Sequence, residues 1–232
     1  MLGVAGSNTV YETIITGLVI QYLISDYTSG SSLPDSSGNV RHGTIVGSPT
    51  HTTPYFTFDG TNDYYRTNDL YSIINGTENH TVETWIYPTG NGVVTSYIGQ
   101  TTVNTDYHHT AIEIVSGNLE FGLWDDGLVS TGSTGSISLN AWHQVTLTYD
   151  GSTCRGYLDG ALSGSATLDW VSPLDYITST EFYVAVGALD STNQGDGTYF
   201  DGRAGIMRYY NRALSLAEIQ NNYNATLPTY SV

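Results

Sequence analysis

Short apolar runs, separated by glycine, asparagine and aspartate, recur along the whole chain. In residues 80–88 (HTVETWIYP), Val82 and Ile86 alternate with Glu83 and Trp85. Because successive side chains of a strand point to opposite faces, this alternation predicts a strand that lies between two layers. About a dozen such segments with tight-turn residues between them favour a sandwich or barrel over βαβ units.

One segment near the end of the sequence has a helical pattern instead. In residues 211–225 (NRALSLAEIQNNYNA), Ser215 precedes Glu218 by three positions, which is the spacing of a capping box. Leu216, Ile219 and Tyr223 then fall on one side of the helix. The sequence therefore predicts one short C-terminal helix.

The composition excludes several classes of partner. The formal net charge of the 232 residues is -16, and all six basic residues are arginines. A nucleic acid or an anionic membrane surface would be repelled, and no apolar run approaches the ~20 residues that span a bilayer. The first residues lack the basic and apolar segments of a secretory signal, so we expect synthesis in the cytosol without one.

Several motifs occur in a familiar order along almost the whole chain. They are residues 55–67 (YFTFDGTNDYYRT), residues 142–153 (WHQVTLTYDGST), residues 157–160 (YLDG) and residues 209–219 (YYNRALSLAEI). Together they resemble the laminin-G-like, concanavalin-A-like lectin/glucanase jelly-roll family, from about Gly17 to Ala225.

The resemblance implies an all-β fold, an antiparallel two-sheet β-sandwich with the short C-terminal helix. In this frame Trp142, Val145 and Leu147 would anchor the core, and residues 55–67 would cross from one sheet to the other. We expect residues 1–16 to be an N-terminal arm or docking segment, 17–225 the jelly-roll domain, and 226–232 a C-terminal tail.

The glutamates argue against hydrolysis. Glucanases that share this fold use two glutamates four residues apart on one strand, with an aspartate between them. The nearest pair here, Glu113 and Glu120, is seven residues apart and is interrupted by a Ser-Gly-Asn turn. We therefore expect this protein not to be an enzyme.

Residues Asp59 and Asp63 admit two interpretations. Their carboxylates are the hard oxygen ligands that Ca²⁺ prefers, so they are the metal-ligand candidates. However, relatives of the family carry an acidic residue in the closing strand where this chain has Gly205. Asp-Gly and Asn-Asp pairs are also common turn formers, which is the interpretation that we favour.

Glycan binding would use exposed aromatic rings together with polar side chains. The candidates are Trp124, Asp125 and Asp126 in GLWDDG, and Tyr107 and His108 in TDYHHT. The alternatives are that Trp124 is a core residue and that the histidines belong to an ordinary surface loop.

We predict a non-catalytic β-sandwich module displayed on a surface. A virion structural protein fits cytosolic synthesis best: a capsid decoration, fibre or tail adhesin subunit that forms a homo-oligomer, contacts capsid or other virion proteins, and attaches to host cell-surface glycans. Its location would be the virion surface or the extracellular space. The alternatives are a free carbohydrate-binding, lectin-like adhesin, and a glycoside hydrolase or lyase.

Overall fold

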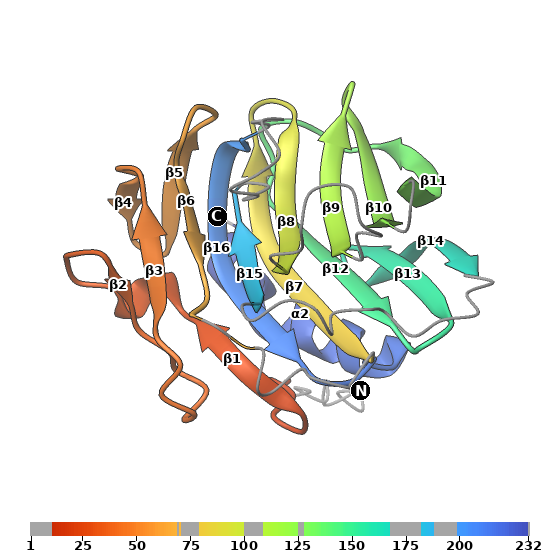
Figure 1. Cartoon of the computed structure of the whole chain (residues 1–232), viewed down its shortest axis with the longest axis horizontal. Coiled ribbons are helices and arrows are strands. Elements are labelled where there is room, and N and C mark those ends of the chain that lie inside the picture. The colour runs from red at the N-terminus through yellow and green to blue at the C-terminus, as the bar shows by residue number, and fades with distance from the viewer. Residues whose placement is uncertain are drawn as a thin grey trace, which may run out of the picture.

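The chain forms two antiparallel sheets packed face to face (Figure 1). The computed structural model describes residues 11–68, 70, 79–99, 109–124, 128–167, 182–187 and 199–231. In these residues the predicted β-sandwich fold with one C-terminal helix is confirmed.

We call the sheet nearer the viewer in Figure 1 the front sheet. Its strands, in spatial order, are β11 (Leu128–Ser136), β10 (Asn118–Trp124), β9 (His109–Val115), β8 (Gly92–Gly99), β15 (Phe182–Val186), β6 (Tyr64–Arg66), β3 (Gly43–Val46) and β2 (Ser32–Leu33).

The other sheet is the back sheet. Its order is β14 (Ala161–Thr167), β13 (Thr153–Leu158), β12 (His143–Tyr149), β7 (His80–Pro88), β16 (Asp201–Tyr210), β5 (Tyr55–Asp59) and β4 (Thr50–Thr52), and β1 (Leu18–Tyr22) also pairs with β16. A short 3-10 helix, η1 (Ile24–Asp26), follows β1. Because β5 lies in the back sheet and β6 in the front sheet, residues 55–67 cross between the sheets as predicted.

Strand β7 confirms the alternation in the sequence. Val82 and Ile86 lie in the main core between the two sheets, where they pack in one cluster with Phe121 of the front sheet. Trp85 faces the opposite way, and its indole N–H donates a hydrogen bond of 2.8 Å to Thr226 of the helix α2 (Leu216–Tyr230). Both faces of β7 are therefore covered, one by the core and one by the helix.

The aromatic residue at the start of β12 differs from the prediction. Val145 and Leu147 are core residues, but Trp142 packs outside the sandwich core, in the cluster that includes Trp85 and Tyr230. Trp142 and Val145 are separated by an odd number of positions, so an extended backbone directs them to opposite faces. The prediction that Trp142 anchors the core is wrong for this reason.

Helix α2 begins as predicted and ends later than predicted. Ser215 and Glu218 form the reciprocal capping box. The helix continues through Pro228 to Tyr230, so residues 226–230 are not a tail. Tyr230 is only 3% exposed, and its ring stacks on Trp85 with centroids 4.8 Å apart. This packing stabilises a last turn that Pro228 alone would disfavour.

The described part of the N-terminal segment packs against the C-terminal part of its own domain. The backbone N–H of Ile14 donates to Asn222 Oδ1 at 2.9 Å, and its carbonyl oxygen accepts from the Tyr210 hydroxyl at 3.0 Å. Arg212 donates to the carbonyl oxygen of Thr16 at 2.9 Å. Residues 1–10 lie outside the described residues, so docking of the full arm on another molecule stays a prediction.

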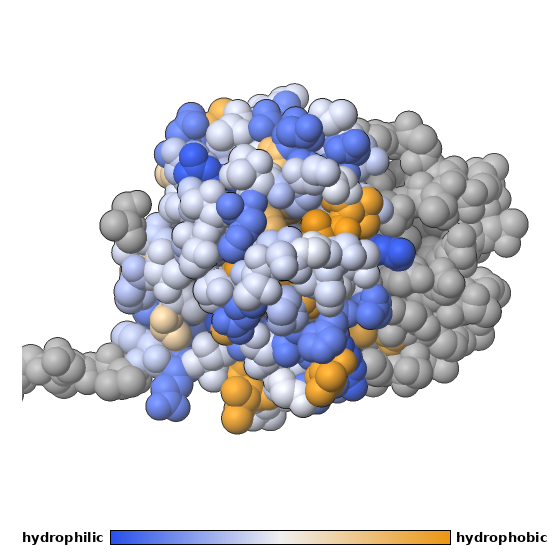
Figure 2. Space-filling view, turned by 90° about the vertical axis from the view of Figure 1, so that its left-hand side faces the viewer, coloured by the Kyte–Doolittle hydropathy of each residue, from blue (hydrophilic) through white to orange (hydrophobic). Residues whose placement is uncertain are grey.

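The edge of the sandwich that holds β2, β3 and β4 has a mainly hydrophilic surface with small, separate apolar patches (Figure 2). Among the described residues, no helix has the length and apolar character needed to cross a membrane.

Candidate functional site

The carboxylate of Asp59 has a structural partner. It lies at the end of β5, and its Oδ1 accepts a hydrogen bond of 2.9 Å from the backbone N–H of Thr61. Gly60 between them has φ +71°, a left-handed conformation that favours glycine. Asp59 therefore stabilises the turn that leads from the back sheet to the front sheet.

The carboxylate of Asp63 holds a second turn. It is 5% exposed, and its Oδ1 accepts from the backbone N–H of Ser48 at 2.7 Å. In the described residues, neither it nor Asp59 belongs to a group of three potential metal ligands. The geometry supports the turn interpretation of both aspartates, and calcium binding stays a prediction.

Four of the five predicted glycan-binding residues are not among the described residues. Asp125, Asp126, Tyr107 and His108 lie outside the described residues. Trp124 is the last residue of β10, where its backbone pairs with His109 and Leu128. These five assignments remain predictions.

Two carboxylates that are seven residues apart in the sequence are neighbours in the front sheet. Glu113 of β9 lies directly opposite Glu120 of β10 in the antiparallel register. Ile112, Ile114, Leu119 and Phe121 on either side of them are all in the main core, so both glutamates face outward. Directly opposed residues have Cβ atoms about 5 Å apart, which brings two like charges together.

The turn between the strands explains why the pair was missed. Ser116 and Gly117 form it with φ +52° and φ +77°, and Glu113 and Glu120 are equally distant from it in sequence. If the two glutamates were on one strand, a spacing of seven residues would place them far apart. In a hairpin centred on this turn, the same spacing makes them cross-strand partners. The Ser-Gly-Asn turn was the signal that could have revealed the pair.

The electrostatics of the pair are unfavourable. Burial raises the pKa of the Glu113 carboxyl above its usual 4.5, and the neighbouring charge of Glu120 raises it further. Among the described residues, neither carboxylate has an ion-pair partner. A half-buried carboxylate beside a like charge gains from any ligand that supplies hydrogen-bond donors, because sugar hydroxyls can replace the lost water.

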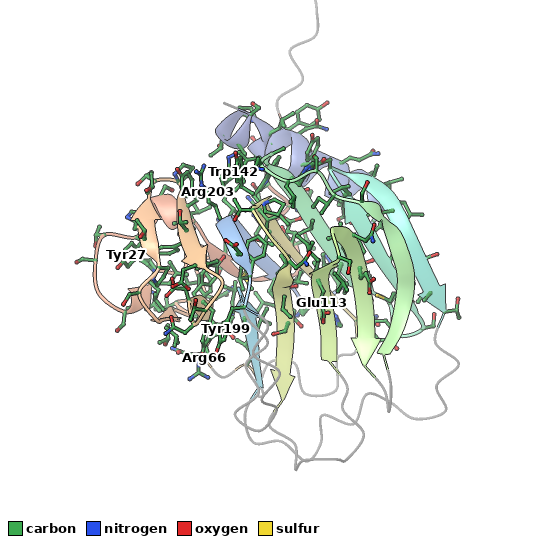
Figure 3. All side chains as sticks on the ribbon, turned by 90° about the horizontal axis from the view of Figure 1, so that it is seen from above. Tyr27, Arg66, Glu113, Trp142, Tyr199 and Arg203 are labelled. Atoms are coloured by element: carbon green, nitrogen blue, oxygen red, sulfur yellow. The ribbon has the colours of Figure 1, made fainter. Side chains whose placement is uncertain are left out.

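Aromatic and cationic groups lie on the same side of the sandwich as Glu113 (Figure 3). Tyr64 and Arg66 belong to β6, and the rings of Tyr64 and Tyr199 are 6.4 Å apart with an interplanar angle of 30°. Figure 3 shows Arg66 and Tyr199 close together at the edge of this face. Across the front sheet, Arg66 pairs with Ala185 of β15, Ala185 pairs with Ser96 of β8, and Ser96 pairs with Ala111 of β9. These three small residues form a row from Arg66 to β9.

The row of small residues between these larger groups is buried: Ala185 and Ser96 are 0% exposed and Ala111 is 2% exposed. Tyr64, Arg66 and Tyr199 stand at one end of the row, and Glu113 and Glu120 stand in β9 and β10 beyond the other. We call these five residues the front face. Its rings, guanidinium and carboxylates are of the kinds that sugar sites combine.

A second cluster has the order of a serine hydrolase triad but an evident structural role. Ser138 Oγ lies 2.7 Å from His143 Nε2, and His143 Nδ1 lies 2.8 Å from Asp159 Oδ2. Asp159 Oδ1 also accepts a hydrogen bond from the backbone N–H of Gln144. The carbonyl oxygen of Ser138 lies 3.2 Å from His143 Nε2. Asp159 and Gly160 form the β13–β14 turn with φ +51° and +74°. The cluster therefore ties this hairpin to β12.

Comparison with known proteins agrees with the architecture. The chain matches solved structures in fold, at low sequence identity. One is domain 4 of a GH43 extracellular arabinanase from Geobacillus stearothermophilus in complex with arabinotriose, with TM-score 0.66, 18% identity, and coverage of 89% of this chain and 98% of that chain. Another is a Trypanosoma rangeli sialidase in complex with sialic acid, with TM-score 0.71, 16% identity, and coverage of 100% of this chain and 36% of the sialidase.

A third structure comes from botulinum neurotoxin type C, whose cell entry depends on interaction with two ganglioside molecules; the TM-score is 0.65 at 15% identity, over 91% of this chain and 52% of that one. This chain thus spans about a third of the sialidase and half of the toxin chain. The comparison with curated proteins gave no match. A family model described as the concanavalin A-like lectin/glucanases superfamily matches residues 59–220. The chain therefore belongs to the concanavalin A-like lectin/glucanase superfamily.

Proposed function

We propose that this protein is a non-catalytic carbohydrate-binding module, and that its glycan binds at the front face. The observation that carries the proposal is the outward-facing pair of Glu113 and Glu120, which burial and mutual repulsion make unfavourable without a ligand. A sugar that presents two or more hydroxyls to the pair would relieve part of this cost by donating hydrogen bonds.

The chemistry of the neighbouring groups favours a glycan over a metal ion. The pair offers only two carboxylates, whereas Ca²⁺ takes 6–8 oxygen ligands. Tyr64 and Tyr199 offer ring faces to the apolar side of a sugar, and Arg66 offers a planar set of donors. The similarity in fold to an arabinanase domain with bound arabinotriose and to a sialidase with bound sialic acid is consistent with this class of ligand.

Hydrolysis at the same pair is the second candidate function. A carboxyl with a raised pKa beside an ionised one is the arrangement that supplies a general acid in glycosidases, and Glu113 has such a pKa. We favour binding because the two glutamates come from adjacent strands and do not form the same-strand pair that glucanases of this fold use. The same experiment separates the two functions.

The test is a glycan-array screen of the purified protein with Ca²⁺ and with a chelator, followed by calorimetric titration of the strongest glycan. Wild type is compared with the double variant Glu113→Gln/Glu120→Gln, and Glu218→Gln on the helix serves as the control. We expect the double variant to bind about tenfold or more weakly and the control to bind normally.

Three outcomes would contradict this proposal. Undiminished binding by the double variant would place the ligand elsewhere. Release of reducing sugar from the bound glycan, abolished in the double variant, would establish hydrolysis instead. Loss of binding on chelation, with the double variant unaffected, would return Asp59 and Asp63 to consideration as calcium ligands.

Display on a virion and assembly as a homo-oligomer rest on the sequence argument and are part of this proposal. The mainly hydrophilic surface of the β2–β4 edge supports display in solution (Figure 2). Sedimentation equilibrium of the full chain tests the oligomer, and a monomer at tens of micromolar concentration would contradict it.

A further inference from the structure

A second aromatic cluster lies on the opposite side of the sandwich from the front face (Figure 3). It consists of Tyr55, Tyr87, Trp142 and Arg203, and we call it the back platform. The Arg203 guanidinium carbon is 4.5 Å from the centroid of the Tyr87 ring and 5.0 Å from that of Tyr55. The Trp142 ring is 5.6 Å from Tyr87 and 5.4 Å from Tyr55. All four residues are half-buried, so part of each is open to solvent.

The register of the back sheet assembles this cluster. Arg203 of β16 lies opposite Tyr87 of β7 on one side and opposite Thr57 of β5 on the other. Tyr55 is two residues from Thr57 and so faces the same way. Trp142 directly precedes His143, the residue that pairs with Ile86 of β7. The four side chains therefore meet on one outward face.

The platform is held from one side by the helix. Tyr230 near the end of α2 lies 4.8 Å from the Trp142 ring, and its hydroxyl accepts a hydrogen bond of 2.8 Å from the backbone N–H of Ile206. Burial raises the pKa of Tyr230 to about 12, so the hydroxyl stays protonated at neutral pH. Trp142 thus rests on a fixed neighbour, which lowers the entropy cost of binding a ligand against it.

The charge of Arg203 differs from that of three other arginines in its surroundings. Arg155, Arg208 and Arg212 each lie within 2.7 Å of a carboxylate oxygen. In the described residues, no carboxylate lies within ion-pair distance of Arg203, although the chain carries a net charge of -16. Asp201 is two residues away, but its Oδ1 accepts from the Thr89 hydroxyl at 2.7 Å.

The contacts with the two tyrosine rings do not use the N–H donors of the Arg203 guanidinium. A ring that lies over a cation contacts the flat face of the guanidinium, whereas the N–H donors project in its plane. A planar carboxylate can receive two parallel hydrogen bonds from these donors. Trp142 beside it offers an apolar surface of the size that packs against one face of a pyranose ring.

We propose that the back platform is a second ligand site, separate from the front face, for a pyranose that bears a carboxylate. Arg203 holds the carboxylate in a bidentate pair, and Trp142 packs against the sugar ring. A polyphosphate ligand is disfavoured because one arginine meets a single negative charge, and the rest of the molecule repels more. The platform needs no contribution from Glu113 or Glu120.

The test uses four small probes and observes the tryptophan indole N–H signals by ¹H–¹⁵N NMR. The probes are methyl β-D-glucuronide and N-acetylneuraminate as two acidic pyranoses, methyl β-D-glucoside as a neutral pyranose, and acetate as a carboxylate without a ring. We expect saturable shifts of the Trp142 signal with at least one acidic pyranose, and binding about tenfold weaker for the glucoside and for acetate.

The variants locate the site and keep the proposal falsifiable. Arg203→Gln should abolish the preference for the acidic probe, and Arg203→Lys should weaken binding while keeping the charge. Arg155→Gln is the matched control, since Arg155 is also half-exposed but has Asp150 as its partner. Thermal unfolding of each variant, run in parallel, separates loss of binding from loss of fold.

Each outcome of these experiments either supports or overturns the proposal of a second site. If the front-face double variant loses its array glycan but keeps the acidic probe, the two sites are independent, as proposed. Equal binding of acidic and neutral pyranoses, or acidic binding retained in folded Arg203→Gln, overturns the proposal. So does the absence of any Trp142 shift at millimolar probe concentration, which would leave Arg203 as a residue that only stabilises the sheet.

Discussion

Two arginines of the same strand have opposite surroundings. Arg208 is 2% exposed in its side chain, and its guanidinium lies 2.7 Å from Glu83 Oε1 beneath the helix. Arg203, five residues earlier in β16, lies between Tyr55 and Tyr87 and has no carboxylate partner among the described residues. Arg208, whose counter-ion the fold supplies, has a structural role, whereas for Arg203 we propose a ligand carboxylate in that place.

The glutamates repeat this contrast. Glu83 is 1% exposed in its side chain but is compensated by Arg208 and by the Asn222 side-chain amide at 3.1 Å. Glu113 is less buried, yet it lies opposite the like charge of Glu120, and its pKa is raised. Burial alone therefore does not distinguish a functional carboxylate, because the identity of its partner decides whether the burial is compensated.

The largest effect should come from breaking the compensated pair. In Arg208→Met, Glu83 would be left as a buried charge without its cation, and we expect a loss of about 3–5 kcal/mol in the free energy of unfolding. Urea denaturation followed by tryptophan fluorescence measures it. The matched control is Arg155→Met, which removes a half-exposed pair with Asp150 and should cost about 0–1 kcal/mol. Equal losses in the two variants would contradict the comparison.

An intermediate effect is expected for the ion pair at the start of α2. Arg212 and Glu218 are each 28% exposed in their side chains and 2.7 Å apart. The hydrogen bond from Arg212, with those from Ser215, lowers the pKa of Glu218 from 4.5 to about 2. A carboxyl with a lowered pKa contributes stability above its unfolded pKa, and this contribution is lost as the pH falls from about 4.5 towards about 2.

Glu218→Gln should therefore be less stable than wild type by about 1 kcal/mol at neutral pH, and the difference should shrink through this acid window. Chemical denaturation between pH 7 and pH 2 measures it, as long as both proteins remain folded. Ser215→Ala is the control, because it removes the cap but keeps the ion pair with Arg212. Its loss should shrink less with falling pH, because only the side-chain contribution of Ser215 to the lowered pKa of Glu218 is removed.

The smallest change in stability is expected for Glu120→Gln. This variant tests directly whether the charges of Glu113 and Glu120 interact. We expect the pKa of Glu113 to fall while staying above 4.5, because burial is the larger cause of its shift. A raised carboxyl pKa means that stability decreases as the pH rises from 4.5 through the folded pKa, so the variant should gain about 0.5 kcal/mol at neutral pH. Titration of the Glu113 carboxyl carbon by NMR measures the shift. An unchanged pKa would show that Glu120 is not its effective neighbour.

Much of the architecture could be predicted because it depends on local patterns. The alternation in residues 80–88, the capping box of Ser215 and Glu218, and the turn at Asp159 and Gly160 each occur as predicted. Such signals need only the periodicity of a strand or helix, or the backbone freedom of glycine. The errors arose where packing overrides local preference, as in the last turn of α2, which Tyr230 secures beyond Pro228.

The candidate sites could not be predicted in the same way, because contacts between strands create them. The sequence by itself determined the sandwich, the helix start and the excess of negative charge. Only the tertiary structure decided which charges are neutralised: Glu83 meets Arg208 across 125 residues, Glu113 meets Glu120 across a hairpin, and Arg203 meets two tyrosine rings. The chemical structure of an ionisable side chain is the same at every position, but the free energy of its charged form depends on the neighbours that the fold places around it.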